Sequence, residues 1–172
     1  MTVIVITGTP GTGKTTLAQA LAKELGFLHI DVSSIIKERK LSEGYDEERQ
    51  CETINQEKLV GVLLDMIADG NGHDSYLFDS HLAHYLPNKA VDLCIVTKCD
   101  LRELKKRLEE RGYSKYKIRE NLDAEIFDVC LVEAMEEQEH DVLVVDTTNG
   151  INGKKTADDV IEILEKKKKV RI

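Results

Sequence analysis

Residues 8–16 read GTPGTGKTT and directly follow the apolar, β-branched run VIVI of residues 3–6. They match the phosphate-binding pattern GxxxxGK[ST] at Gly8, Gly13, Lys14 and Thr15. Glycines let backbone N–H groups turn around a phosphate, the lysine reaches the outer phosphates, and the threonine hydroxyl binds magnesium. A strand before the loop and an amphipathic helix after it separate this motif from a chance glycine-rich turn. The stretch therefore predicts a site for a nucleoside triphosphate.

Short β-branched runs alternate with helical patterns along the rest of the chain. Strands are expected at residues 2–7, 27–31, 75–79, 92–97 and 142–145. Helices are expected from about residue 13 and at 35–40, 55–68, 100–111, 118–138 and 156–169. The helix at 118–138 is expected to be continuous, with an apolar face formed by Leu122, Ile126, Val129 and Met135. This alternation predicts an α/β three-layer P-loop fold, with helices on both faces of a parallel sheet, in one domain over residues 1–172.

Composition excludes several classes of protein. The 172 residues suffice for one domain with a sizeable core, and 41% hydrophobic with 33% charged residues is typical of a globular protein. No apolar stretch approaches the roughly 18 residues of a membrane span, and the N-terminal run is too short for a signal peptide, so a cytoplasmic location is expected. The four cysteines form no CxxC pair, which disfavours zinc, and Cys94 and Cys130 are expected in the core.

Charge is distributed unevenly. The formal net charge of −8 disfavours non-specific nucleic-acid binding and suits a basic protein partner. The C-terminus has the opposite sign, with Lys166, Lys167, Lys168, Lys169 and Arg171. Two interpretations stay open: these cations complement the dipole at a helix C-terminus, or they form a tail that contacts RNA.

Residues 97–100, Thr-Lys-Cys-Asp, imitate the [NT]KxD motif with which GTPases bind guanine. Two features favour the alternative that Asp100 caps a helix. Glu103, three residues later, completes a capping-box pattern. Asp79 is followed by Ser80, His81 and Leu82, without the glycine of a GTPase DxxG motif. An ATP-binding protein is thus favoured over a GTPase, and protection against thermal unfolding by ATP or by GTP distinguishes the two.

Five segments occur in an order that resembles one known family: GTPGTGKTT at 8–16, IDVSSIIKE at 30–38, GYDEE at 44–48, DSH at 79–81 and ERGYSKYKIRENLDAEIFD at 110–128. They resemble the adenylate kinase 6 family, called the coilin-interacting nuclear ATPase in animals, over about residues 2–148. The resemblance implies a nucleoside monophosphate kinase fold with a five-stranded parallel sheet, a monophosphate-binding flap at about 32–53 and a lid at about 110–120. It also implies ATP:AMP phosphotransfer and ATPase activity with Mg²⁺, and a link to maturation of the small ribosomal subunit through one of its basic proteins.

The resemblance also implies roles for individual residues. ATP would be held by Gly11, Gly13, Lys14, Thr15 and Thr16. Arg107 and Arg111, four apart on one helix face, would enter the lid and clamp phosphates during transfer. For Arg107 a salt bridge with Glu103 stays an alternative. Asp79 matches the Walker B position and would bind magnesium together with Thr15, or it would only cap its strand.

Two positions depart from the family pattern. Adenylate kinases carry an arginine on the flap where this chain has Lys37, and Arg39 is close enough to substitute, so both are expected to bind AMP. After the fourth strand the family usually has arginine, and here the residue is Lys98. Lysine keeps the charge but lacks the bidentate fork that matches a phosphate, which argues against efficient AMP phosphorylation and leaves ATP binding unaffected.

The catalytic set expected from these arguments is Lys14, Asp79, His81 and Arg111. Positions i and i+2 of an extended strand face the same side, so Asp79 and His81 are expected to point together at the γ-phosphate, where the imidazole would activate a water. The alternative is a histidine that caps the strand or packs under the flap. His84 and His140 are expected at the surface or in packing. The same site would serve a metabolic nucleotide kinase or an ATP-driven assembly factor, and both stay open.

Overall fold

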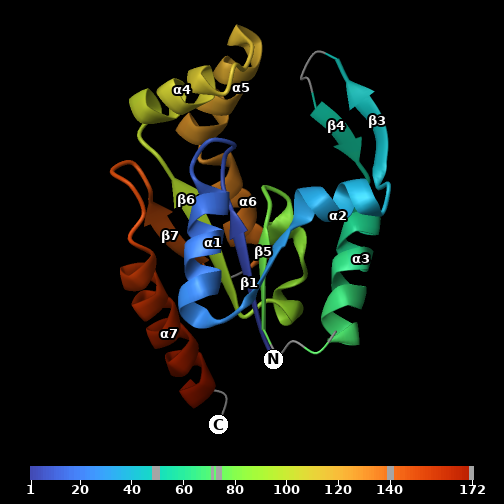
Figure 1. Ribbon diagram of the computed structural model, residues 1–172, viewed down its shortest axis with the longest axis vertical. Coiled ribbons are helices and arrows are strands. Elements are labelled where there is room, and N and C mark those ends of the chain that lie inside the picture. Colours follow the sequence, from blue (N-terminus) through green and yellow to red (C-terminus); the bar gives the residue numbers. More distant parts are fainter. Residues whose placement is uncertain (48–50, 71, 73–74, 139–141, 171–172) are drawn as a thin grey trace.

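A five-stranded parallel sheet forms the centre of the protein, as the sequence predicts (Figure 1). The computed structural model describes residues 1–47, 51–70, 72, 75–138 and 142–170. The strands lie side by side in the order β2-β5-β1-β6-β7, and every neighbouring pair is parallel. Their bounds are β1 Thr2–Thr7, β2 Leu28–Asp31, β5 Ser75–Asp79, β6 Leu93–Lys98 and β7 Val142–Asp146.

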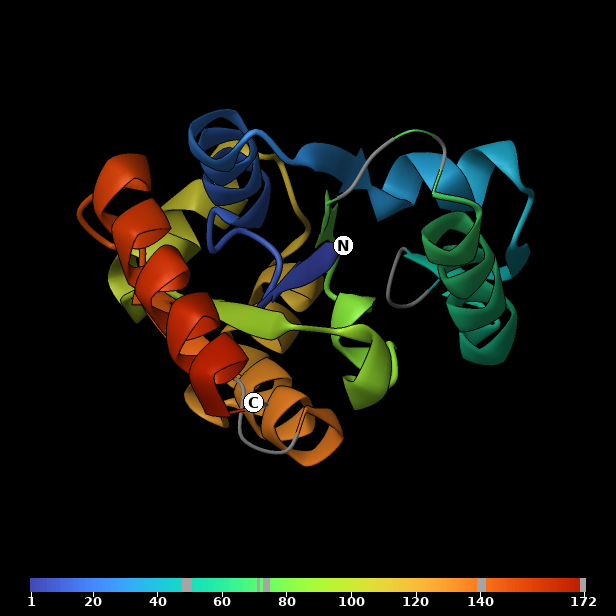
Figure 2. The same ribbon diagram turned by 90° about the horizontal axis from the view of Figure 1, so that it is seen from below.

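Helices cover both faces of the sheet because its strands are apolar on both sides. Ile4 and Ile6 of β1 pack toward α1 (Lys14–Leu25) and α7 (Gly153–Val170). Val3 and Val5, which point the other way, share a core with α2 (Val32–Glu38), α3 (Gln56–Asp69) and α6 (Val129–Glu137). Figure 2 shows α1 and α7 on one side of the sheet and α6 on the other. The layers therefore confirm the three-layer α/β fold.

The carboxyl edge of the sheet is the place where a ligand can bind. β1 pairs with β5 on one side and with β6 on the other, so the connections diverge there and leave a crevice. Helices α4 (Leu101–Glu110) and α5 (Lys115–Ile126) rise on one side of this crevice. The hairpin of β3 (Ser42–Asp46) and β4 (Cys51–Ile54) rises on the other (Figure 1). Two short helices, η1 (Ala83–Tyr85) and η2 (Asn88–Ala90), connect β5 to β6.

The segment expected to be a flap contains more structure than the sequence predicts. The helix expected at 35–40 instead begins at Val32, because the Asp31 side chain accepts a hydrogen bond from the Ser33 amide at 2.9 Å and caps it. The β3–β4 hairpin follows and was not predicted. Most of its side chains are exposed, so it lacks the alternation of apolar and polar residues that indicates a strand.

The single helix predicted at 118–138 is wrong: the chain forms α5 and α6 with a sharp turn between them. Asp128 adopts a left-handed conformation with φ of 54°, which ends the first helix, and aspartate tolerates this conformation better than most residues. The predicted apolar face consequently does not form. Ile126, Val129 and Met135 are 51, 38 and 54% exposed. Cys130 is also not a core residue, because it is half-buried and lines a cleft, whereas Cys94 is buried as predicted.

The basic residues near the C-terminus fall at the end of α7. Lys166 pairs with Glu162 at 2.6 Å, and the Lys167 side chain donates to the Asp92 carbonyl. These contacts favour cations that decorate a helix C-terminus over a free tail, although Lys168 and Lys169 are exposed. Arg171 and His140 lie outside the described residues. Across the described chain, no helix is both long and apolar enough to pass through a membrane.

Candidate active site

The phosphate-binding loop lies between β1 and α1, and its backbone conformation requires glycine. Gly8 has a φ of 139°, and a Cβ atom there would lie 2.5 Å from Thr97 Oγ1 and 2.6 Å from the Thr97 carbonyl oxygen. Gly11, with a φ of 94°, packs so closely on α4 that a Cβ would meet Leu104 Cδ1 at 2.8 Å. The loop is thus wedged between β6 and α4, at positions where only glycine fits.

Threonine hydroxyls from three segments hold this loop. Thr12 Oγ1 donates to the Thr9 carbonyl at 2.7 Å and lies 2.6 Å from Thr97 Oγ1. Thr147, just after β7, donates from its Oγ1 to the Thr12 carbonyl at 2.6 Å. All four side chains are buried. The loop conformation is therefore fixed by the protein alone.

Glu125, which is 5% exposed, ties α5 to the same loop. Its Oε2 accepts from Thr9 Oγ1 at 2.6 Å, and its Oε1 accepts from the Cys99 amide and from Lys98 Nζ, each at 3.0 Å. Lys98 also pairs with Asp128 Oδ1 at 2.5 Å. Lys98, where the resemblance predicts an arginine, is consequently engaged with carboxylates at the α5–α6 turn. Sequence reasoning missed this role, since nothing local to residue 98 indicates its partners.

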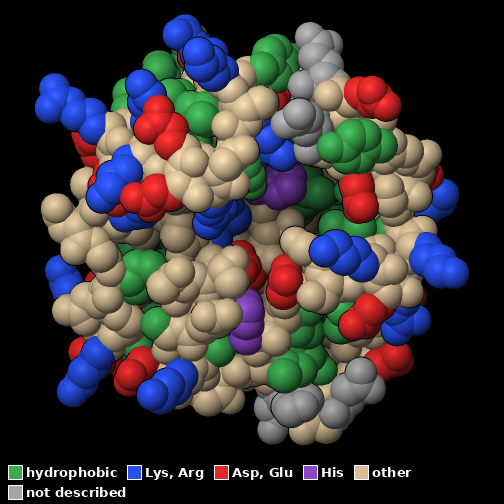
Figure 3. All heavy atoms as spheres, turned by 45° about the horizontal axis from the view of Figure 1, so that its top comes forward, with side chains coloured by type: hydrophobic (Ala, Val, Ile, Leu, Met, Phe, Trp, Pro, Cys, Tyr) green, Lys and Arg blue, Asp and Glu red, His purple; other side chains and the backbone are tan. Residues whose placement is uncertain are grey.

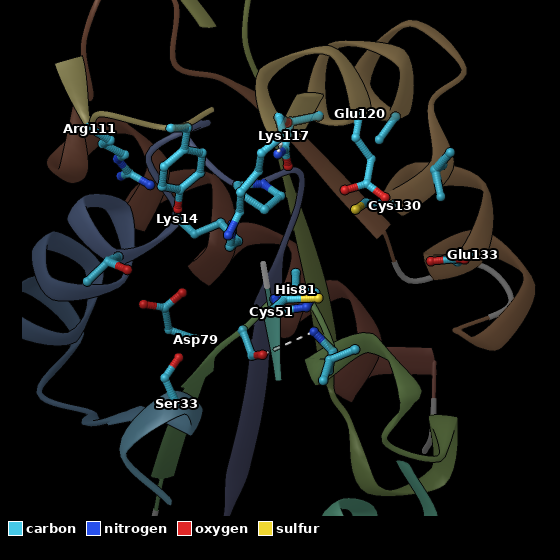
Figure 4. A pocket seen from close by; sticks show the side chains of 18 of the residues that line it. Lys14, Ser33, Cys51, Asp79, His81, Arg111, Lys117, Glu120, Cys130 and Glu133 are labelled. Atoms are coloured by element: carbon cyan, nitrogen blue, oxygen red, sulfur yellow. Dashed lines mark hydrogen bonds between the residues drawn. The ribbon is translucent and has the colours of Figure 1, made fainter. Parts of the chain in front are cut away.

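Lys14 extends from the start of α1 into the cleft (Figure 4). Its Nζ donates to the Thr9 carbonyl at 3.1 Å. Burial lowers the pKa of Lys14 from 10.5 to about 8, while the nearby Asp79 carboxylate acts in the opposite direction. The ammonium group is hence desolvated and still protonated at pH 7. A partly desolvated cation attracts a phosphate more strongly than a hydrated one.

Asp79 ends β5 on the opposite wall and is 3% exposed. Its Oδ2 lies 3.7 Å from His29 Nε2, and neither atom has a hydrogen-bond partner among the described residues. Asp79 and Thr15 both line the cleft, and a carboxylate beside a hydroxyl there fits an oxygen-binding cation such as Mg²⁺. The described residues contain no cluster of three side chains that could hold a metal on their own. The remaining ligands would come from phosphate oxygens and water, as is usual for Mg²⁺.

His81 reaches the cleft, but by another route than the one expected. β5 ends at Asp79 and the chain bends at Ser80, so the rule for alternate residues of a strand does not apply. His81 faces solvent through the mouth of the cleft. Burial against the cleft walls, and then the positive charges of Lys14 and Lys117, lower its pKa to about 4. The imidazole is therefore neutral at pH 7, and a pKa of about 4 makes it a weak base.

These side chains surround one cleft of about 610 Å³, visible as the hollow in Figure 3. Lys14, Thr15, Asp79, His81 and Arg111 all line it, and Figure 4 shows Lys14, Asp79 and Arg111 around the same space. Lys117, Glu120 and Glu133 form its far wall and were not singled out from the sequence. Lys117 could have been predicted at the cleft from its position within the RGYSKYK segment. Glu133 lines the cleft only because the chain turns at Asp128, which the sequence does not indicate.

Two further cavities adjoin this cleft. One of about 460 Å³ is lined by Gly11, Gly13, Thr16, Arg107 and Arg111. Arg107 pairs with Glu103 at 2.9 Å, so the salt bridge considered as an alternative is present. Arg107 also donates to the Thr147 carbonyl at 2.9 Å and lines this cavity. Arg111 belongs to both the cleft and this cavity and is placed between them.

The other cavity, of about 320 Å³, lies between α2, the hairpin and the start of η1. Lys37 and His81 line it, whereas Arg39, which follows α2, does not. Of the two residues expected to bind AMP, the structure therefore brings Lys37, and not Arg39, to this cavity. Asp100 caps α4 by accepting from the Arg102 amide at 2.9 Å, which confirms the capping interpretation of the GTPase-like motif. His84 is fully buried, in agreement with the packing alternative.

A phosphate loop after β1 of this sheet, with Lys14 and the strand-end carboxylate of Asp79 around one cleft, is the arrangement of P-loop nucleotide kinases. Comparison with known proteins agrees. A family model described as an AAA domain matches residues 4–128. The adenylate kinase isoenzyme 6 homolog of Dictyostelium discoideum is 40% identical over 141 residues, covering 82% of this chain and 78% of that protein. The adenylate kinase isoenzyme 6 homolog FAP7 of Saccharomyces cerevisiae is 36% identical over 142 residues, covering 82% and 70%.

The chain belongs to the adenylate kinase isoenzyme 6 family, as the sequence motifs indicate. It is an adenylate-kinase-like nucleotide kinase. A crystal structure of a protein from Chloroflexus aurantiacus matches with a TM-score of 0.58 at 17% identity, over 94% of this chain and 97% of that one. At this identity the likeness shows the fold alone.

Proposed function

We propose that the protein transfers the γ-phosphoryl group of ATP to AMP or another nucleoside monophosphate, and to water when the acceptor is absent. The observation that carries this proposal is the arrangement of three adjoining cavities around one set of catalytic groups. Lys14, Asp79, His81 and Arg111 line the central cleft, which is flanked by a cavity on the α4 side and a cavity under the hairpin. A donor and an acceptor nucleotide can thus meet at a common point.

In this proposal the base and ribose of ATP occupy the 460 Å³ cavity beside Arg107, and the triphosphate lies in the loop from Gly11 to Thr16. The monophosphate occupies the 320 Å³ cavity, where Lys37 meets its phosphate. Residues 32–53 would close over it as the flap, and residues 110–120 would close as the lid. Arg39 would join the acceptor site only if flap closure moves it.

The proposed chemistry is an in-line displacement at the γ-phosphorus. An acceptor oxygen forms a bond to phosphorus as the bond to the β–γ bridging oxygen breaks, and ADP leaves. Lys14 and Arg111 supply positive charge around the transferring group, where electrostatic stabilisation provides most of the catalysis. Thr15 and Asp79 would hold Mg²⁺, which when bound neutralises phosphate charge. When water is the acceptor, neutral His81 takes its proton.

Phosphorus NMR of ATP and Mg²⁺ with the protein, with and without AMP, tests the proposal. Transfer to AMP forms two ADP for each ATP consumed and no inorganic phosphate. Hydrolysis forms one ADP and one inorganic phosphate for each ATP. Failure to consume ATP under both conditions would refute the catalytic proposal.

We also propose that the protein acts in small ribosomal subunit maturation by binding a basic protein of that subunit. The net charge of −8 and the motif resemblance support this. The test is retention of small-subunit proteins by the immobilised chain at low salt, with and without ATP. If no small-subunit protein is retained with or without ATP, the proposed partner is refuted. The protein is then a nucleotide kinase without this assembly role.

A further inference from the structure

The outward side of α6 is apolar and exposed. Val129, Val132 and Met135 are 38, 47 and 54% exposed, and Phe127, just before the helix, is 72% exposed. With Ile126 at 51%, they are five exposed apolar side chains within ten residues of sequence. We call Ile126, Phe127, Val129, Val132 and Met135 the α6 surface. Three of these residues, Ile126, Val129 and Met135, were predicted from the sequence to lie on a buried helix face. They are exposed instead, so packing in the core does not explain why they are apolar.

The opposite face of α6 fixes its rotation. Ala134 is fully buried in the core under the sheet. Gln138 Nε2 donates to the His84 carbonyl at 2.7 Å and to the Leu86 carbonyl at 2.6 Å. Residues three and four apart share a helix face, so the α6 surface cannot turn inward without breaking these contacts. Its exposure therefore follows from the packing of the helix.

Carboxylates surround this surface. Residues 120–138 contain seven Asp or Glu and no Lys or Arg. Lys98 engages Glu125 and Asp128, and Arg119 engages Asp123, which leaves the excess negative charge on α6 itself. Glu136 and Glu137 are exposed there, and Glu133 lies at the cleft. A second copy of this chain would place like charges against each other, which costs binding energy, whereas a basic partner gains it.

The surface also adjoins the catalytic cleft. Val129, Cys130 and Glu133, at the start and middle of α6, line that cleft. Figure 2 shows α6 at the periphery of the molecule, where a partner can approach. A segment seated on the α6 surface would therefore lie beside the mouth of the nucleotide site.

We propose that the α6 surface is the docking site for a basic protein segment, whose apolar side chains cover Phe127, Val132 and Met135 while its Lys or Arg side chains face Glu136 and Glu137. This rests on the partner half of the proposed function and adds the location of the interface. Exposed aromatic and methionine side chains in a charged rim are the usual anchors of such interfaces.

The test uses the immobilised full chain and the proteins extracted from purified small ribosomal subunits. Phe127→Ala/Met135→Gln removes the apolar anchors, and Glu136→Lys/Glu137→Lys reverses the rim charge. The matched controls lie on α7: Ile161→Ala, at a position 44% exposed, and Glu165→Lys. Each double variant should retain at least about tenfold less of a basic protein that the wild type retains, since anchor residues carry most interface energy. Each control should retain as much as the wild type, and ATP turnover should be unchanged because none of these residues lines the cleft.

Equal retention by the double variants and the controls would overturn the α6 surface and leave the partner proposal standing. Retention of nothing, or only of acidic proteins, by the wild type would overturn both. Light scattering identifies the other occupant: a wild-type dimer that Phe127→Ala/Met135→Gln makes monomeric would assign the surface to a second copy and refute the proposal.

Discussion

At the scale of single residues, Lys14 is the group on which turnover depends most directly. Lys14→Ala should reduce ATP consumption to below about a tenth of the wild-type rate, because loss of a main phosphate contact costs several kcal/mol of barrier. Steady-state ADP formation measures this, and circular dichroism checks that the fold persists. A variant that folds and retains more than that rate would contradict the role of Lys14.

His81 separates the two reactions proposed for the cleft. His81→Ala should lower ATP hydrolysis by roughly 10²-fold, within the usual range for a general base, because water must lose a proton as it attacks. AMP-dependent transfer should fall much less, since a phosphate acceptor is already ionised. Parallel assays of inorganic phosphate and of ADP give the two rates. Equal losses would instead indicate a role at the magnesium site, beside Asp79.

His84 predicts how stability depends on pH. Burial lowers the pKa of this fully buried side chain to about 4, against 6.5 when it is exposed, even though Glu133 Oε2 lies 3.3 Å away. Between these values the unfolded state binds more protons than the folded state. The free energy of unfolding is therefore highest above pH 6.5 and falls toward pH 4, by up to about 3 kcal/mol from this group. Urea denaturation at several pH values should show a flatter profile for His84→Asn, and identical profiles would contradict the assignment.

At the scale of elements, Glu125 makes α5 a support for the phosphate loop. Thr9→Val removes the hydroxyl that donates to it at 2.6 Å and should cost about 1.5–3 kcal/mol of stability, as for hydrogen bonds to charged groups. It should also raise the KM for ATP, because the loop loses one restraint. Thr156→Val is the control, since its hydroxyl donates to the Asn152 carbonyl, just before α7, and not to a group of the phosphate loop. Additive effects of Thr9→Val and Glu125→Gln would show that the two residues are not coupled.

The elements also show what the sequence could predict and why. Buried parallel strands such as β5, at residues 75–79, can be predicted from the sequence because both their faces are apolar. The β3–β4 hairpin is not, because its exposed residues carry no periodic pattern. The break at Asp128 escaped prediction since Leu122, Ile126, Val129 and Met135 suit one long helix. Only the tertiary contacts of Lys98 with Glu125 and Asp128 show where the chain turns.

At the scale of the whole molecule, the residues of the site also fall into those that the sequence could predict and those that it could not. Lys14, Thr15, Asp79, His81 and Arg111 could be named from the sequence because they belong to contiguous motifs, and the fold brings them to one cleft. Lys117 and Glu120 belong to the motif at residues 110–128 but were not singled out in it, and Glu133 reaches the cleft only because the chain turns at Asp128. Arg39 was expected at the acceptor site from its closeness in sequence to Lys37. Its position after the end of α2 keeps it from the cavity that Lys37 lines.

The three adjoining cavities predict a response to a ligand that spans them. Diadenosine pentaphosphate joins two adenosines through five phosphates, so it should raise the thermal midpoint more than ATP or AMP at the same concentration, as expected for tighter binding to the folded state alone. Differential scanning fluorimetry with and without Mg²⁺ measures the shift. A smaller shift than that given by ATP would argue against a shared donor and acceptor site.

The hydrogen bonds by which threonine side chains hold the phosphate loop affect the entropy of nucleotide binding. A loop that is already held by Thr12, Thr97 and Thr147 has little backbone freedom left to lose when a nucleotide arrives. Rigidity of this kind removes an entropic penalty from binding, at roughly 1–2 kcal/mol for each residue that would otherwise have to be ordered. Calorimetry of ADP binding should therefore show a less unfavourable entropy for the wild type than for Thr147→Val, whose loop must be ordered by the ligand itself.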